Sequence, residues 1–183
     1  MASPLARTAR GEPAATAPSR RLAAVPSTEK PTFTLPNLAG TPLKLEAQHG
    51  RVVLVHFFAT WCAPCREELS SLARLVQGPR GKRIAVVAVN VAEVPVRVRC
   101  FFDGTPVSFP VVLDADRTVT RAWGVGILPT TFVLDPALQP RLFVEGDLDW
   151  SRPDILAALD SVSGVQPTEI STPTPGTSTG RSQ

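Results

Sequence analysis

Two cysteines separated by two residues lie at the junction between a predicted strand and a predicted helix. Residues 51–58 are mostly β-branched or aromatic, which is typical of a central strand covered on both faces. Residues 63–77 then place apolar side chains at helical spacing, and Gly78-Pro79 follows as a stop signal. Cys62 and Cys65 therefore lie in the first turn of a helix that leaves a buried strand.

This position favours redox chemistry at the cysteine pair. The unpaired N–H groups and the dipole of a helix N-terminus stabilise a thiolate, and the thiolate is the form that attacks a disulfide. Cys62 is therefore the predicted nucleophile, and Cys65, one helical turn further on, is predicted to resolve the mixed disulfide. Trp61 is expected to shield one side of the site and to contact the substrate.

The alternative interpretation of such a pair is half of a zinc site. A closed zinc site needs four ligands, usually from two cysteine pairs. The other candidates are Cys100, His49 and His56, and none is spaced like a second pair. We therefore predict a dithiol without a metal or another cofactor. Cys100 is expected to pack as a small apolar residue, and His49 to face solvent.

The chain between residues 31 and 163 alternates strands and helices. The order predicts an α/β fold, with a mixed central sheet, helices on both faces and an extra N-terminal β-hairpin around Gly40. Two adjacent parallel strands need a crossover, whereas the last two strands form an antiparallel hairpin. Ser151 is expected to cap the last helix. Besides 51–58, strands are predicted at 33–35, 43–45, 84–90, 110–113, 130–134 and 141–145, and besides 63–77, helices at 93–102, 118–123 and up to Val162.

The two ends differ in composition from this middle part. Residues 1–30 lack aromatic side chains and are rich in Ala, Pro, Ser, Thr and Arg, while Thr, Ser, Pro and Gly dominate residues 164–183. Neither end can bury enough apolar surface to fold by itself. We predict a disordered basic arm at 1–30, one domain at 31–163 and a disordered tail at 164–183.

Charge and hydropathy exclude several functions for the domain. The formal net charge of +3 arises in the arm, because residues 31–163 carry thirteen side chains of each sign. A neutral domain gives no electrostatic footprint for nucleic acid or an anionic membrane. No apolar run approaches the roughly 20 residues that span a bilayer. Ser19-Arg20-Arg21-Leu22 is similar to a twin-arginine export signal, but the apolar stretch after it ends at Pro26, short of the about 7–15 residues that a cleavable signal needs.

Three sequence blocks together resemble the TlpA/ResA-type thioredoxin-like proteins. The resemblance extends over residues 31–163, including the N-terminal hairpin that thioredoxin itself lacks, and it implies a thioredoxin fold. In chain order, the blocks are VHFFATW at 55–61, CAPCREEL at 62–69 and GVGILPTTF at 124–132.

The resemblance implies substrate-binding residues on the third block. Pro129 is expected to be a cis-proline facing the dithiol, since cis bonds are largely confined to X-Pro. The backbone of Leu128 would then pair with the extended chain of a substrate, as in strand addition. Thr130 is expected to contribute a further substrate contact.

Two further residues are candidates for proton transfer. Glu68 matches the family's acidic residue three positions after the second cysteine, where it could accept or supply a proton; a solvated first-turn acid is the alternative. His56 stands where thioredoxins have a buried aspartate. A proton relay to Cys65 and a hydrogen-bonded strand histidine are both open interpretations.

The predicted function is the reduction of disulfides in protein substrates, and the family implies a membrane thiol transporter as electron donor. We expect a monomer; the family implies a periplasmic or extracytoplasmic location, although no signal peptide is visible. One alternative is a cytochrome c maturation reductase, which typically has an acid at the position of Thr130. Another is a copper chaperone, whose cysteines are usually three residues apart. A non-catalytic thioredoxin-like module would ordinarily have lost one cysteine.

Overall fold

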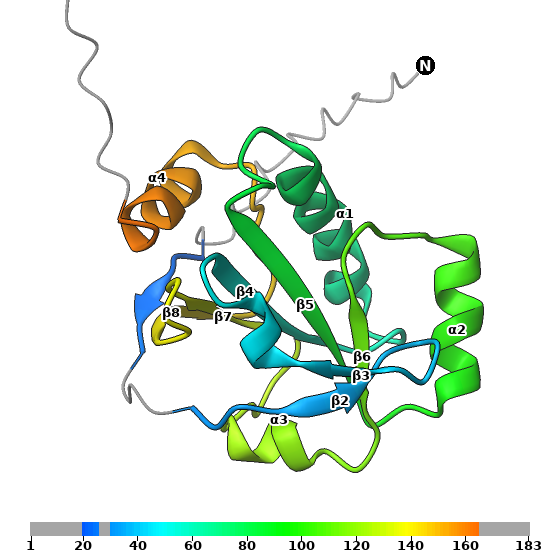
Figure 1. Ribbon diagram of the computed structural model, residues 1–183. Coiled ribbons are helices and arrows are strands. Elements are labelled where there is room, and N and C mark those ends of the chain that lie inside the picture. The colour runs from blue at the N-terminus through cyan, green and yellow to red at the C-terminus, as the bar shows by residue number, and fades with distance from the viewer. Residues whose placement is uncertain (1–19, 26–29, 165–183) are drawn as a thin grey trace, which may run out of the picture.

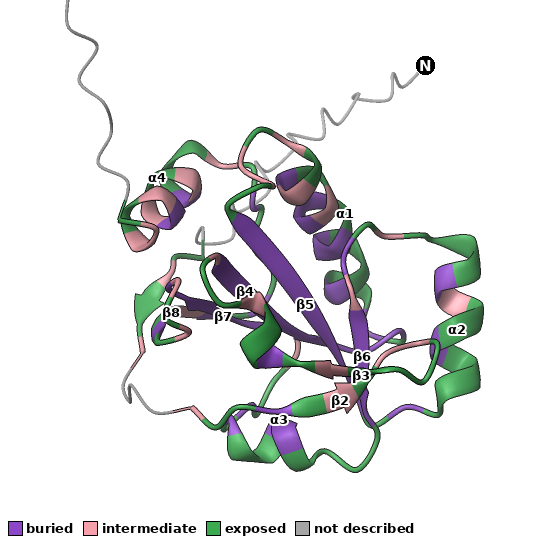
Figure 2. Cartoon of the chain, in the orientation of Figure 1, coloured by how far each residue is buried: buried purple, intermediate pink, exposed green. Residues whose placement is uncertain are grey.

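Two parallel strands, β4 (Val52–Phe58) and β5 (Ile84–Val91), lie at the centre of the computed structural model, which describes residues 20–25 and 30–164 (Figure 1). Every residue of both strands is buried (Figure 2). This is the environment that favours β-branched residues along a whole strand rather than at alternate positions.

The main sheet contains six strands in the order β1-β8-β7-β4-β5-β6. Strand β6 (Val111–Asp114) is parallel to β5, whereas β7 (Thr130–Leu134) and β8 (Pro140–Glu145) form an antiparallel hairpin beside β4. Strands β2 (Thr34–Pro36) and β3 (Pro42–Lys44) pair separately as the predicted N-terminal hairpin. The predicted fold class is confirmed.

Two hydrophobic cores fill the two faces of this sheet, because successive side chains of a strand point to opposite sides. Leu54 and Phe58 face the core that includes side chains of α1 (Ala63–Gln77), α2 (Pro95–Gly104) and α4 (Pro153–Val162). Phe57 faces the other core, which α3 (Thr118–Ala122), the 3₁₀ helix η1 (Leu45–Gln48) and the N-terminal hairpin cover.

Strand β1 (Ala23–Ala24) lies within the segment predicted to be a disordered arm, so that prediction is wrong for residues 20–25. Its backbone pairs with the edge strand β8, where Ala23 lies opposite Phe143. Arg20 adds a hydrogen bond from its guanidinium to the carbonyl of Glu145, 2.7 Å away. Backbone pairing with an unoccupied sheet edge does not depend on apolar content, which is why composition missed this strand. Residues 1–19, 26–29 and 165–183 lie outside the described residues.

The predicted cap of the last helix is also wrong. Arg152 is the N-cap of α4, and the Ser151 hydroxyl donates instead to Asp149 Oδ1, 2.6 Å away. Pro153 occupies the first helical position, as proline prefers, and this fixes the cap one residue later than the Ser-x-x-Asp pattern suggested.

Candidate active site

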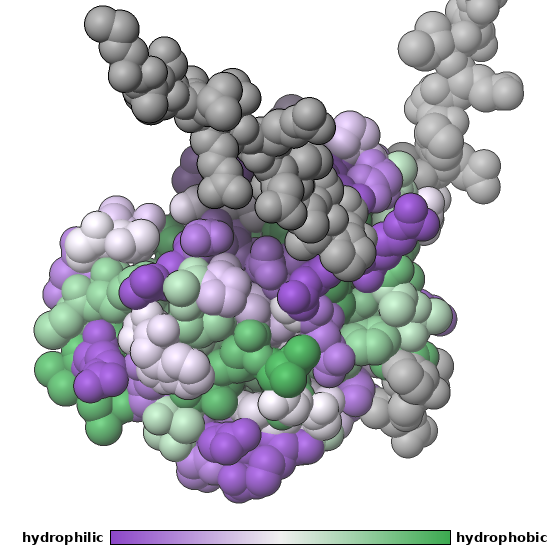
Figure 3. Space-filling view, turned by 180° about the vertical axis from the view of Figure 1, so that it is seen from behind, coloured by the Kyte–Doolittle hydropathy of each residue, from purple (hydrophilic) through white to green (hydrophobic). Residues whose placement is uncertain are grey.

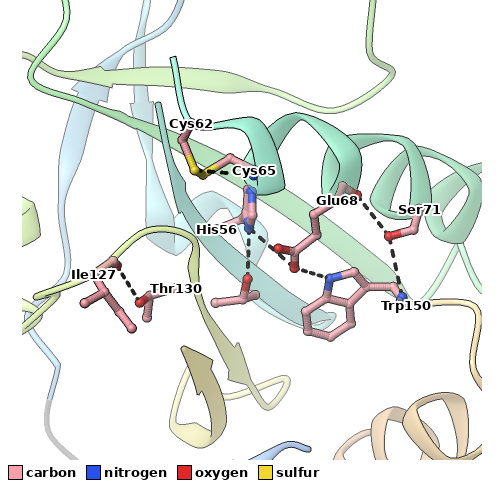
Figure 4. A network of polar contacts seen from close by, with 9 residues as sticks. His56, Cys62, Cys65, Glu68, Ser71, Ile127, Thr130 and Trp150 are labelled. Carbon is pink, nitrogen blue, oxygen red and sulfur yellow. Dashed lines mark hydrogen bonds and ion pairs between the residues drawn. A yellow bond between two sulfur atoms is a disulfide. The ribbon is translucent and has the colours of Figure 1, made fainter. Parts of the chain in front are cut away.

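Cys62 and Cys65 form a disulfide at the N-terminus of α1 (Figure 4). Cys62 is the N-cap residue, and its Sγ accepts a hydrogen bond from the backbone N–H of Cys65 at 3.3 Å. Cys65 is fully buried, whereas Cys62 retains 6% of its surface. The sulfur nearer to solvent is therefore also the one that the helix N-terminus polarises. The division of roles between the two cysteines stays a prediction.

Glu68 is buried beneath the same helix, so the alternative of a solvated first-turn acid is wrong. Its Oε1 accepts a hydrogen bond from the indole Nε1 of Trp150 at 2.5 Å and lies 3.9 Å from Nδ1 of His56. Glu68 comes one helical turn after Cys65, and both face the sheet. Figure 4 shows His56 between the cysteine pair and Glu68.

His56 is fully buried on β4 and hydrogen-bonded, at 2.9 Å, between its Nδ1 and the hydroxyl of Thr131 on β7. The interpretation as a hydrogen-bonded strand histidine is confirmed; a relay function stays a prediction. His56 Nε2 and Glu68 Oε2 have no hydrogen-bond partner among the described residues. The strand and the helix thus bring two buried polar atoms without a partner among the described residues into the same part of the core.

Burial makes both side chains neutral near pH 7. Desolvation lowers the pKa of His56 to about 3, because the imidazolium would lie in the core. Desolvation likewise raises the pKa of Glu68 to about 8, partly offset by the hydrogen bond from Trp150. The contact between them is therefore not an ion pair at neutral pH, but a carboxylic acid beside a neutral imidazole.

The loop before β7 lies beside the dithiol and contains the predicted cis bond, Leu128–Pro129. The Pro129 carbonyl accepts from the backbone N–H of Gly146 at 2.6 Å, which attaches the loop to the end of β8. Thr130 is buried, and its hydroxyl donates to the carbonyl of Ile127 at 2.9 Å. The side chain of Thr130 therefore bonds within the loop, and the substrate contacts predicted for Thr130 and Leu128 stay predictions.

A groove of mixed polarity lies between this loop, the end of β5 and the start of α3, with Trp61 in its wall. Its lining includes Trp61, Val91, Ile127 and Leu128, with Arg117 as the charged residue. Trp61 and Ile127 are 65% and 51% exposed, far above the level of the core residues. Figure 3 shows the face opposite to the view of Figure 1, where hydrophobic residues gather in patches between hydrophilic ones. Trp61 is therefore placed where it can touch a docked chain.

The predictions from the sequence missed one buried acidic residue at the site, Glu93. Its two oxygens accept hydrogen bonds from the backbone N–H of Thr60 at 2.7 Å, the Thr60 hydroxyl at 2.6 Å and the side-chain amide of Asn90 at 2.7 Å. Glu93 thus fixes the backbone two residues before Cys62. Its position just beyond the carboxyl end of a buried parallel strand was the available signal. Trp150, the partner of Glu68, carried no comparable signal.

Cys100 was predicted to be buried, and this is wrong: its thiol is exposed on α2 and forms no disulfide. The inward residues of α2 are Val98 and Phe102, and a residue midway between two positions four apart points to the opposite side of a helix. His49 is exposed, as predicted. Among residues 20–25 and 30–164, no three His, Cys, Asp or Glu side chains are grouped so that they could hold a metal ion.

The fold and the dithiol at the start of α1 together define a thiol–disulfide oxidoreductase of the thioredoxin type. The chain belongs to the AhpC/TSA family, whose profile matches residues 26–139.

Individual relatives agree with this assignment. Thiol-disulfide oxidoreductase ResA of Bacillus subtilis is 38% identical over 108 residues, which cover 59% of this chain and 60% of that protein. The ResA protein of Geobacillus thermodenitrificans is 33% identical over 132 residues, or 72% of this chain and 75% of that protein. These matches confirm the resemblance to the TlpA/ResA type.

The solved structures show the same fold. A Chlorobium tepidum protein described as a thiol:disulfide interchange protein DsbE is 31% identical, with a TM-score of 0.63 over 74% of this chain and 96% of that one. A DsbF homologue from Corynebacterium diphtheriae, at 20% identity, has a TM-score of 0.66 over 82% of this chain and 97% of its own.

Proposed function

We propose that this protein reduces disulfides in protein substrates through the reduced Cys62–Cys65 dithiol. The observation that carries the proposal is the asymmetry of the pair. Cys62 Sγ sits at the helix N-terminus and accepts the Cys65 N–H bond, while Cys65 is completely buried. A nucleophile must be a thiolate within reach of the substrate, and a resolving thiol must be reachable only from inside.

The reaction balances as two successive exchanges. The Cys62 thiolate attacks one sulfur of the substrate disulfide, forms a mixed disulfide and releases the other substrate sulfur as a thiolate. Cys65, after losing its proton, attacks Cys62 Sγ and releases the second substrate thiolate. The substrate gains two electrons and takes up two protons in total, and the enzyme is left with its Cys62–Cys65 disulfide. A dithiol donor reduces that disulfide again by the reverse exchanges.

The buried Glu68 and His56 support proton transfer at Cys65. A carboxyl group with a pKa of about 8 is close to the ordinary pKa of a thiol, about 8.5, so a proton moves between the two groups at little cost. In the oxidised enzyme Glu68 is protonated at pH 7 and can supply the proton that Cys65 needs when the donor releases it as a thiolate. His56 remains neutral throughout and offers a nitrogen lone pair in the same buried region.

Substrate docking is proposed at the exposed groove beside the dithiol. The backbone of Leu128 would pair with an extended segment on one side of the substrate cysteine, while Trp61 covers its other side. Both contacts use the main chain or an apolar surface, so they suit protein substrates of varied sequence.

The test is mixed-disulfide trapping with a peptide that carries a single disulfide and a fluorophore. The reduced Cys65→Ser variant is expected to accumulate a covalent enzyme–peptide complex that dithiothreitol releases, because the resolving thiol is gone. The reduced Cys62→Ser variant is expected to form none and to lose reductase activity. Trapping by Cys62→Ser but not by Cys65→Ser would reverse the assignment, and trapping by neither would refute the proposed reaction.

A further inference from the structure

Trp150 is attached to the dithiol helix by two polar links. Its indole Nε1 donates to Glu68 Oε1 at 2.5 Å, and its backbone N–H donates to the hydroxyl of Ser71 at 3.5 Å (Figure 4). Ser71 in turn donates to the carbonyl of Glu68 at 2.9 Å. Trp150 is fully buried in the segment between β8 and α4, so it has little freedom to leave this arrangement.

The indole bond distinguishes the two oxygens of the Glu68 carboxyl group. An indole N–H can donate but cannot accept, so Oε1 must act as an acceptor. In a protonated carboxyl group, the oxygen without the proton is the better acceptor. The acid proton therefore belongs on Oε2, the oxygen that has no other partner among the described residues.

We infer that Trp150 is a positioning residue for proton transfer at the dithiol: its indole N–H fixes Oε1 as the acceptor and leaves the acid proton on Oε2. This rests on the proposed function, because it concerns the proton that Cys65 exchanges during reduction and reoxidation. Trp150 itself touches neither sulfur nor substrate and acts through Glu68.

Several other groups face Glu68, and those that affect its pKa have to be separated from the effect of the indole hydrogen bond. His56 faces it from β4 and is neutral; Thr131 faces it from β7 and carries no charge. Desolvation raises the pKa of Glu68 most, and the carboxylate of Asp147, before α4, raises it further by repulsion. Among the hydrogen bonds that lower this pKa, the one from Trp150 has the largest effect, ahead of those from the Leu148 backbone and the Thr131 side chain. On α1 itself, Arg66 and Glu67 are exposed to solvent.

The experiment compares Trp150→Phe with Trp123→Phe in the oxidised full-length protein. Trp123 is a matched control, since it is also buried and its Nε1 donates a hydrogen bond, to the carbonyl of Pro31 on the other face of the sheet. The carboxylic-acid C=O stretch of Glu68 is followed by infrared spectroscopy from pH 5 to 10 and assigned by its loss in Glu68→Gln. In Trp150→Phe, the band is expected at higher frequency, because its carbonyl oxygen has lost a donor.

The titration midpoint of that band gives the second readout. It is expected to rise by about one pH unit in Trp150→Phe, the size of one lost hydrogen bond to an ionised carboxylate, and to stay unchanged in Trp123→Phe. The pH profile of disulfide exchange should move by the same amount. An unchanged band and midpoint in Trp150→Phe, or an equal change in Trp123→Phe, would overturn the inference.

A measurement on the unmutated residue covers the case in which Trp150→Phe does not fold. In ¹⁵N-labelled protein, the indole N–H resonance of Trp150 should titrate with the midpoint of Glu68 and stop doing so in Glu68→Gln, whereas that of Trp123 should not move. A flat Trp150 resonance between pH 6 and 10 would refute the inference. Successful trapping by Cys65→Ser with a flat resonance would leave the proposed function intact and remove only the role of Trp150.

Discussion

The Nδ1 atom of His56 and the Oε1 atom of Glu68 lie 3.9 Å apart, and both side chains are completely buried. Burial keeps each of them uncharged near neutral pH, with the pKa of His56 lowered to about 3 and that of Glu68 raised to about 8. The two groups therefore titrate on opposite sides of neutrality, and each has a defined effect on the free energy of unfolding.

The oxidised protein is expected to be most stable between about pH 4.5 and 6.5. Above pH 6.5, the folded state still holds the Glu68 proton that the unfolded chain has lost, so stability falls by about 2 kcal/mol up to pH 8. Below pH 4.5, the unfolded chain protonates His56 while the folded state does not, so stability falls by about 2 kcal/mol down to pH 3. Urea unfolding at a series of pH values measures the free energy of unfolding on both the alkaline and the acid limb of this profile.

Two variants separate these limbs. Glu68→Gln should remove the fall above pH 6.5 and extend the rise in stability from pH 3 up to about pH 6.5, because the slope of His56 is then no longer cancelled. His56→Asn should remove the loss of stability below pH 4.5 and extend the fall over the whole range from about pH 4.5 to 8. If both limbs persist in both variants, the pH dependence of stability originates in other groups.

Glu93→Gln is expected to lower the melting temperature by about 5 °C or more. A carboxylate can accept all the hydrogen bonds from Thr60 and Asn90, but an amide must direct an NH₂ group at one of these donors. Calorimetry measures the loss, and Glu67→Gln, an exposed change on α1, is the control. Equal melting temperatures for the two variants would show that the hydrogen bonds of Glu93 to Thr60 and Asn90 do not stabilise the fold.

Cys100 should be the reactive thiol of the oxidised protein. Cys62 and Cys65 are joined, and Cys100 is exposed, so a maleimide is expected to add once per chain before reduction and not at all in Cys100→Ser. Mass spectrometry counts the adducts. Turnover of Cys100→Ser should equal that of the parent protein, because the thiol lies outside the site; a lower turnover would assign Cys100 a role in the reaction.

Strand β1 should contribute to the stability of the domain. A chain of residues 31–163 lacks its pairing with β8 and the bond from Arg20 to Glu145, so we expect it to melt several degrees below a chain of residues 20–164. Turnover on a small disulfide should be the same for both at 25 °C, since neither lacks a residue of the site. Equal melting temperatures would restore the prediction that the domain begins at residue 31.

The strand–helix junction and its cysteine pair could be predicted from the sequence because their determinants are local. Strand composition, apolar spacing on the helix and the stop at Gly78-Pro79 all lie within about thirty residues of each other, and the structure agrees closely. The position of Cys100 was readable in the same way, since Val98 and Phe102 define the inward face of α2. The general tendency of thiols to be buried was the weaker guide there.

Tertiary structure alone decided what surrounds the dithiol. Glu68 meets Trp150 from 82 positions along the chain, and Thr60 meets Glu93 from 33 positions away. Periodicity tells which face of an element is buried, but not which distant side chain covers it, because that depends on how helices and loops settle onto the sheet. For the same reason the sequence placed an acid at Glu68 without its partners, and it could not reveal that burial keeps that acid protonated at neutral pH.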